Sequence, residues 1–250
     1  MKSCAFVAAA ALLTAVVADI AAANAANVVV VGANGRTGQP LIKILKERGH
    51  HVRASVRKAE TAAGLGADEV VVADITKPET LGAAVKGMDY VMCVTGSGGG
   101  DPEITDNAGI SALADAAKAA GAKQIVLMSS IGAEMTSPSD NTTVRRPQVM
   151  IAKNKGEAHI RKIGLPYTIV RPGGLAENCE GGKTGVALGK LTSPQNRAIN
   201  PPPICRVDVA AVMAESMGNP ATMNKTFTTI AAPAEAPNAW KAKLKDLPKD

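Results

Sequence analysis

The feature that most constrains this chain is a run of four valines that leads through three spaced glycines into a helical segment. The stretch reads Val28-Val-Val-Val-Gly-Ala-Asn-Gly-Arg-Thr-Gly38. A strand that turns through glycines into a helix points free backbone N–H groups and the positive helix end at one place. This predicts a cradle for the phosphates of a dinucleotide. Its expected residues are Gly32, Asn34, Gly35, Arg36, Thr37 and Gly38.

The three glycines have separate expected roles. Gly32 permits the tight turn, Gly35 lets the backbone approach the phosphates, and Gly38 allows the helix to pack closely on the strand.

The rest of the chain alternates short β-branched runs with longer segments rich in Ala, Leu and Lys, which is typical of βαβ units. With 250 residues, 46% of them hydrophobic, the chain can build one sizeable core. We expect an α/β fold: a single Rossmann-type domain whose doubly wound parallel sheet carries helices on both faces. The expected strands are 27–31, 51–56, 69–72, 90–94, 124–128, 167–170 and 226–230. The expected helices are 39–47, 78–85, 104–120, 155–162 and 207–217.

The first, third, fourth and fifth of these strands are nearly continuous in Val, Ile, Leu or Met. Such runs are typical of strands that are covered on both faces.

The two ends of the chain differ from this pattern. Residues 1–25 combine Lys2, an uncharged apolar stretch and the small-residue sequence Ala23-Asn24-Ala25, which predicts a cleavable targeting leader. The apolar stretch is short for a membrane span. The leader predicts export or targeting to an organelle, which is a plastid if the source is photosynthetic. Residues 26–230 form the expected Rossmann domain, and the Ala/Pro/Lys-rich residues 231–250 a tail outside the core.

Charge, aromatic content and the spacing of cysteines and histidines indicate which partners, disulfides and metals to expect. The net charge of +6 is spread among 22 acidic residues and aromatics are 2%, so we expect no nucleic acid partner. The mature chain would keep Cys93, Cys179 and Cys205, and this odd number without close spacing predicts reduced thiols. No histidine, cysteine or carboxylate spacing predicts a metal site.

The end of the second strand indicates which dinucleotide is bound. Proteins specific for NAD(H) usually place a carboxylate there, whereas this strand ends in Val56-Arg57-Lys58. Arg57 and Arg36 could hold a 2′-phosphate, so NADP(H) is expected over NAD(H). Asp74 and Ile75 are expected beside the adenine. Thr95 and Gly96 are expected along the pyrophosphate and nicotinamide.

These residues resemble the NmrA-like, atypical short-chain dehydrogenase family, in particular its NAD(P)-binding branch from plants and cyanobacteria. The resemblance runs from about residue 27 to 230, and biliverdin-IXβ reductase/flavin reductase is more distantly similar. The matching stretches are Val31–Gln39, Ala73–Thr76, Asp115–Lys118, Asn154–Glu157, Leu165–Leu175, Arg206–Ala210 and Asn224–Phe227. The resemblance implies that Ser129, Lys155 and Gly173 contact the cofactor, and that Ser130 and Lys155 are catalytic.

One residue of the family's catalytic set is missing. Four residues before Lys155 stands Ile151 where short-chain dehydrogenases carry the proton-donating tyrosine, and Tyr167 is interpreted as a packing residue. This favours an NADP(H)-dependent oxidoreductase that transfers hydride to a conjugated acceptor such as a flavin, quinone or tetrapyrrole. The alternative is a protein that binds NADP(H) without turnover, as a redox sensor or assembly factor.

Overall fold

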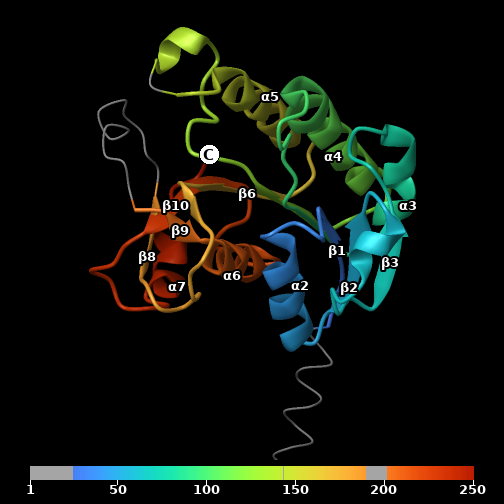
Figure 1. The fold of residues 1–250 in the computed structure, drawn as a ribbon, viewed down its shortest axis with the longest axis horizontal. Helices are drawn as coiled ribbons and strands as arrows, with labels where there is room; N and C mark the ends of the chain where they lie inside the picture. The colour runs from blue at the N-terminus through green and yellow to red at the C-terminus, as the bar shows by residue number, and fades with distance from the viewer. Residues whose placement is uncertain (1–24, 143, 190–201) are drawn as a thin grey trace, which may run out of the picture.

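The computed structural model describes residues 25–142, 144–189 and 202–250 (Figure 1). The expected leader, apart from Ala25, lies outside these residues. No helix in the described part of the chain has the length and apolar character needed to cross a membrane.

A central sheet organises the domain. Its eight described strands run in the order β3-β2-β1-β4-β5-β6-β10-β8, and neighbours are parallel except β8, which is antiparallel to β10. The strands are β1 (Asn27–Val31), β2 (His51–Val56), β3 (Glu69–Val72), β4 (Tyr90–Cys93), β5 (Gln124–Met128), β6 (Tyr167–Pro172), β8 (Val186–Gly189) and β10 (Lys225–Ala231). The expected strands are confirmed, and β1 lies inside the sheet between β2 and β4. β8 was not expected.

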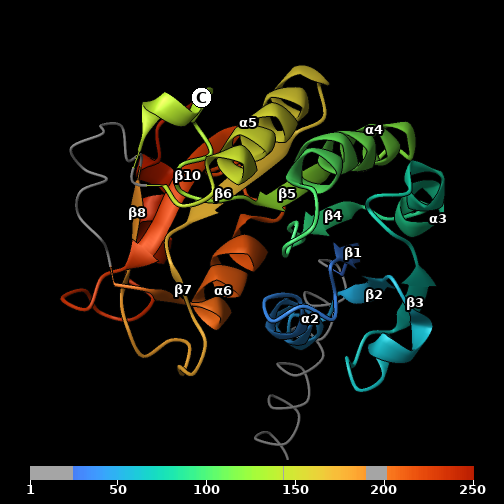
Figure 2. The same ribbon diagram turned by 45° about the horizontal axis from the view of Figure 1, so that its top comes forward.

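Helices cover both faces of the sheet, as Figure 2 shows. On one face lie α2 (Gly38–Glu47) and α6 (Arg206–Ser216), and on the other lie α3 (Leu81–Val85), α4 (Ile110–Ala119) and α5 (Pro147–Lys162). The valines of β1 alternate between the two resulting cores: Val28 and Val30 enter one, Val29 and Val31 the other. This arrangement confirms the doubly wound fold.

The edge strand β3 corrects one expectation. Val70 and Val72 are 50% and 54% exposed, so β3 is not covered on both faces. Their register partners Ala54 and Val56 do enter the core below α2 and α6. The helices α2 and α6 therefore do not extend over the edge strand of the sheet.

The helix α5 begins eight residues before the expected start. Pro147 occupies its first turn, where a missing N–H costs nothing, and Val149, Ala152, Gly156 and Ile160 form its buried face. Before α4, residues Glu103–Gly109 form a π-helix, a rare geometry that often marks functional sites.

The expectation of three reduced thiols is wrong. Cys179 and Cys205 form a disulfide with a Cα–Cα distance of 5.9 Å, and the free thiol among the described residues is the buried Cys93. Burial raises the pKa of the Cys93 thiol. The short parallel pair β7 (Leu175–Ala176) and β9 (Ile204–Cys205) brings the two cysteines together. Because the two cysteines are 26 residues apart, no short motif in the sequence indicated that they pair.

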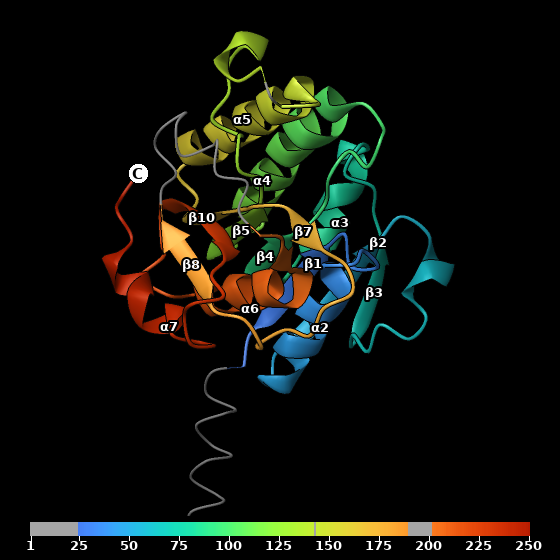
Figure 3. The same ribbon diagram turned by 60° about the vertical axis from the view of Figure 1, so that its left-hand side comes forward.

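The expectation of a C-terminal tail outside the core is also wrong. Trp240, Leu244 and Leu247 are 3%, 3% and 6% exposed and belong to the core on the α2 and α6 face. They lie in or just after the short helix α7 (Trp240–Lys243), next to β8 in Figure 3. Asp250 accepts a hydrogen bond from the backbone N–H of Thr226 at 2.9 Å. The spacing of four and then three residues places the apolar side chains on one helical face, which the Lys-rich composition concealed.

Candidate functional site

The site lies where the strand order reverses, at the carboxyl ends of β1 and β4. Ligands of open α/β sheets bind at such a point because the loops on either side of it diverge. A cavity of about 450 Å³ opens here. Its walls come from the ends of β1 and β2 and from the segments that follow β1, β2, β3 and β4.

The glycine loop lies against this cavity in a tightly constrained turn. Gly32 has φ +88°, which favours glycine, and the Gly35 N–H donates to the Gly32 carbonyl at 3.0 Å. A Cβ on Gly38 would lie 2.5 Å from the Ala33 carbonyl oxygen and closer still to that of Gly32. The first turn of α2 therefore packs directly on the loop. Thr37, the N-cap residue, makes no side-chain cap. Of the first three helical residues, Gln39 donates its N–H to the Gly35 carbonyl and Pro40 has none, which leaves the Gly38 N–H for an anion.

The cavity gathers most of the residues expected around a dinucleotide. Gly32, Asn34 and Gly35 line it from the loop. The remaining expected residues that line it are Arg57, Asp74, Ile75, Thr95 and Gly96. These residues come from four different loops, and the fold brings them into one wall.

Asp74 remains an anion within this wall. Burial raises its pKa, but hydrogen bonds from the backbone and side chain of Thr76, together with the charges of Arg57 and Lys77, bring the pKa below its ordinary value.

Arg36 lies apart from Arg57. Its guanidinium is 70% exposed and pairs with Glu177 at 2.7 Å, and it does not line the cavity. Glu177 also accepts from Arg206 at 2.7 Å, while a second nitrogen of Arg206 donates to the Thr37 hydroxyl at 3.3 Å. The two arginines expected to clamp one phosphate are thus not brought together. Sequence reasoning missed Arg206 and Glu177, although Arg206 begins one of the matching stretches.

The two serines after β5 differ in their partners. The Ser129 hydroxyl donates to Glu157 at 2.5 Å, and Glu157 is fully buried and paired with Arg171 and Arg161 at 2.5 and 2.7 Å. Ser129 is thereby committed to a structural ion cluster. The Ser130 hydroxyl donates only to the backbone carbonyl of the next residue, at 3.1 Å, and is part-buried. Neither serine lines the cavity, and Ser130 is the one whose hydroxyl is not tied to the ion cluster.

Lys155 and Lys153 occupy different faces of α5. Lys155 is 51% exposed and pairs with the equally exposed Glu103 at 2.9 Å. Lys153 is 14% exposed and pairs at 2.8 Å with Asp106, which is 1% exposed and accepts from the Ser97 N–H at 3.2 Å. The structure therefore places Lys153, and not Lys155, behind the loop that follows β4.

Close packing of α5 accounts for the position of Lys153. A Cβ on Gly156 would collide with the Asp106 carbonyl oxygen, so only glycine lets α5 approach the π-helix this closely. Lys153 precedes Gly156 by about one helical turn, so the close approach of α5 brings Lys153 within reach of Asp106. The buried spacing of Ala152, Gly156 and Ile160 was the signal that could have identified it.

Neither tyrosine of the chain reaches the cavity. Tyr167 is 7% exposed and its hydroxyl donates to Asp250 at 3.1 Å. Burial, together with the charge and hydrogen bond of Asp250, raises the pKa of Tyr167 to about 12. Tyr167 is a packing residue, as expected, and Tyr90 begins β4 at the opposite end of the strand. Gly173, after β6, donates its N–H to the Thr229 carbonyl at 3.0 Å and does not line the cavity.

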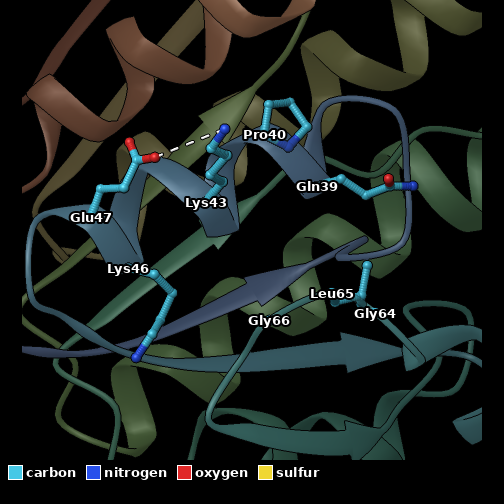
Figure 4. Close-up of a pocket in the computed structure, with 8 residues that line it drawn as sticks. All are labelled: Gln39, Pro40, Lys43, Lys46, Glu47, Gly64, Leu65 and Gly66. Carbon is cyan, nitrogen blue, oxygen red and sulfur yellow. Dashed lines mark ion pairs between the residues drawn. The ribbon is translucent and has the colours of Figure 1, made fainter.

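A second hollow, of about 550 Å³, lies between α2 and the turn at residues 64–66 (Figure 4). Its lysines are already paired, Lys43 with Glu47 at 3.9 Å and Lys46 with Asp68 at 2.6 Å. This hollow gathers no buried polar group, so the chemistry of the site belongs to the smaller cavity. In the described part of the chain, no three His, Cys, Asp or Glu side chains form a metal cluster.

The strand order, the glycine turn and the cavity at the reversal point define a dinucleotide-binding protein of the Rossmann class. The family model described as NAD(P)H-binding matches residues 32–220, and the chain belongs to this NAD(P)H-binding family.

The relatives of this chain include named reductases. Sanguinarine reductase of Eschscholzia californica is 29% identical over 86% of this chain and 92% of its own length. The NAD(P)H azoreductase of Xenophilus azovorans is 34% identical over 60% of this chain and 49% of its own length. An uncharacterised chloroplastic protein of Arabidopsis thaliana is 35% identical over 76% of this chain, which spans 65% of that protein.

The fold is also similar to that of a solved structure. A Bacillus halodurans protein assigned as an NAD-dependent epimerase/dehydratase is 30% identical, with a TM-score of 0.76 over 88% of this chain and 99% of that one.

Substitutions at Gly35 and Gly38 should have different effects, the first on dinucleotide binding and the second on the stability of the fold. We expect Gly35→Val to abolish dinucleotide binding while the domain still folds, because Gly35 is exposed on the cavity side and its Cβ would meet one loop carbonyl at 3.0 Å. Gly38→Ala should instead lower the free energy of unfolding by about 1–3 kcal/mol, because its Cβ overpacks the buried turn. NADPH fluorescence and urea unfolding measure the two effects. Retained fluorescence enhancement in Gly35→Val would place the phosphate cradle elsewhere.

Proposed function

We propose that this protein binds NADP(H) in preference to NAD(H) and transfers hydride to a small conjugated acceptor of the flavin, quinone or tetrapyrrole type. The observation that carries the cofactor preference is Arg57. It follows β2 and lines the cavity at the position where an NAD(H)-specific protein presents a carboxylate. A guanidinium there can bind a 2′-phosphate through paired, charged hydrogen bonds. Arg36 would have to leave Glu177 to join it.

The residues of the cavity fit the rest of the dinucleotide. The loop from Gly32 to Gly38 and the start of α2 would hold the pyrophosphate. Asp74 and Ile75 would lie at the adenosine, and Thr95 and Gly96 along the chain toward the nicotinamide. Neither lysine lines the cavity: Lys153, through the buried Asp106, would support the loop of Gly96 and Ser97 from behind, and Lys155 would have to leave Glu103 to reach the cofactor.

The type of acceptor follows from the missing tyrosine. A bound reduced nicotinamide supplies hydride, and the described cavity offers no phenol to supply the proton. Ser130 can donate a hydrogen bond to an acceptor atom, but a hydroxyl is too weak an acid to protonate an alkoxide efficiently. Conjugated acceptors spread the added charge and take their proton from water. Two relatives named as reductases, one of sanguinarine and one of azo compounds, support a reductase.

The same observation favours a second candidate. Because both tyrosines lie elsewhere, the protein could retain NADP(H) without turnover and act as a redox sensor or assembly factor.

We also propose that residues 1–25 are a targeting leader that is removed before the protein functions. The chloroplastic relative supports an organelle as the destination. The fold tolerates a start at Ala26, whose carbonyl accepts from His51 at 3.0 Å. A later start would remove Asn27, whose N–H donates to Asp89 at 2.9 Å.

Arg57→Ala should remove the preference for the phosphorylated cofactor. We expect NADPH to bind more tightly than NADH to the wild type, and the substitution to cost NADPH about 1.5–3 kcal/mol, the value of a charged hydrogen bond. Calorimetry with both cofactors measures this, with Lys58→Ala as the matched control. Equal affinities in the wild type, or an unchanged preference in Arg57→Ala, would refute the assignment.

A screen of flavins, quinones and tetrapyrroles with NADPH separates the enzyme from the sensor. We expect oxidation of NADPH with at least one acceptor, and a loss of kcat of roughly tenfold or more in Ser130→Ala, because one hydrogen-bond donor to the transition state is removed. Ser111→Ala, on α4, is the control. A sensor would oxidise NADPH with none of them and bind NADPH and NADP⁺ with different affinities.

N-terminal sequencing of protein from its native source tests the leader. We expect the mature chain to begin at Ala26 or within a few residues of it, because a much later start would cut into β1. Met1 still attached to a soluble protein would overturn the proposal.

A further inference from the structure

One buried hydroxyl in the cavity wall has no partner. Ser55, in β2, is 2% exposed, and its Oγ makes no hydrogen bond to any part of the chain that the structure describes. Two other buried side-chain atoms share this condition, His50 Nδ1 and Thr229 Oγ1. Of the three residues, Ser55 alone lines the cavity beside the glycine loop.

The pairing of β2 explains why the hydroxyl is left without a partner. Ser55 stands in register with Val31 on one side and Val71 on the other, and neither side chain can accept or donate a hydrogen bond. Its neighbours Ala54 and Val56 enter the core below α2 and α6, so Ser55 faces the opposite side of the sheet.

An apolar residue would suit this position better in the absence of a ligand. Buried polar groups are nearly always hydrogen-bonded, because leaving one unpaired costs the full loss of its hydration. Alanine would fill the same place in the strand without that cost. A partner supplied from the cavity would remove the cost.

We infer that Ser55 is a ligand-binding residue and that its hydroxyl bonds the adenosine part of the dinucleotide. This inference rests on the proposed function, because it takes the cavity to be the dinucleotide site. The phosphates belong at the glycine loop, whereas Ser55 lies two residues before Arg57 and shares the wall with Asp74 and Ile75. A purine ribonucleoside carries ring nitrogens, an amino group and ribose hydroxyls, and a serine hydroxyl can donate to or accept from each of these.

The inference gives different roles to two residues that line the cavity, Ser55 in β2 and Arg57 just after it. Arg57 recognises the 2′-phosphate and so distinguishes NADP(H) from NAD(H). Ser55 bonds a part that both cofactors share, so it raises the affinity for both by the same factor.

The test uses two fragments that lack the nicotinamide, ADP and 2′,5′-ADP, with the full chain in calorimetry. We expect Ser55→Ala to weaken both fragments equally, by roughly five- to tenfold, the value of one neutral hydrogen bond. The unliganded variant should unfold at the same temperature as the wild type or a higher one, because the unpaired hydroxyl is gone. Ser55→Cys keeps a side chain of similar volume, but its thiol forms only weak hydrogen bonds. Its affinity for each fragment should therefore lie between that of the wild type and that of Ser55→Ala, which guards against a folding artefact.

Thr229→Val is the matched control, because it also removes a buried unpaired hydroxyl but lies outside the cavity wall. It should leave both affinities unchanged. Wild-type affinity of Ser55→Ala for ADP would overturn the inference, and so would a loss confined to 2′,5′-ADP, which would place the hydroxyl at the phosphate.

A failure of the proposed NADP(H) preference would give a different result from a failure of the Ser55 inference. If Arg57→Ala keeps the wild-type ratio of 2′,5′-ADP to ADP affinity, the NADP(H) preference fails, while the effect of Ser55 on ADP still decides the inference. If the wild type binds neither fragment, both are overturned.

Discussion

The close approach of α2 to the end of β1 is the constraint on which the rest of the site depends. Gly38 has no room for a Cβ between the carbonyl oxygens of Gly32 and Ala33. The first turn of α2 is therefore fixed directly against the loop whose residues Gly32, Asn34 and Gly35 line the cavity. β1 supplies a rigid base for this contact, because Val28 to Val31 are at most 3% exposed and are held by the cores on both faces.

A cluster of buried charges plays the corresponding part on the other side of the cavity. Glu157 is fully buried, and Ser129, Arg161 and Arg171 all donate to its carboxylate. A buried carboxylate is tolerated only when such partners replace water. The cluster joins α5 to the ends of β5 and β6. It thereby fixes both the strand end that carries Ser130 and the helical turn that carries Lys153.

The two flanks of the glycine loop are electrostatically different. On the β2 side Arg57 lines the cavity beside Asp74. On the α6 side Glu177 bridges the guanidinium groups of Arg36 and Arg206, and the disulfide between Cys179 and Cys205 holds the two segments that carry Glu177 and Arg206. Hydrogen bonding and the charge of Arg206, with Arg36 nearby, lower the pKa of Glu177 despite some loss of hydration. The carboxylate therefore remains an anion that offsets these two cations.

The sequence by itself determined seven of the eight described strands of the sheet, the glycine turn and eight of the residues that line the cavity. These features are local: strands buried on both faces read as continuous apolar runs, and a tight turn into a helix requires glycines at fixed spacing. Contacts between distant segments decided the rest. The disulfide depends on the pairing of β7 with β9, and the burial of Trp240 depends on a core built by residues far earlier in the chain. Lys153 and Lys155 are the same residue type two positions apart, and only the phase of α5 against the π-helix sends one inward and the other to solvent. Local sequence does not record that phase, because it is set by how closely Gly156 lets two segments of the folded chain approach.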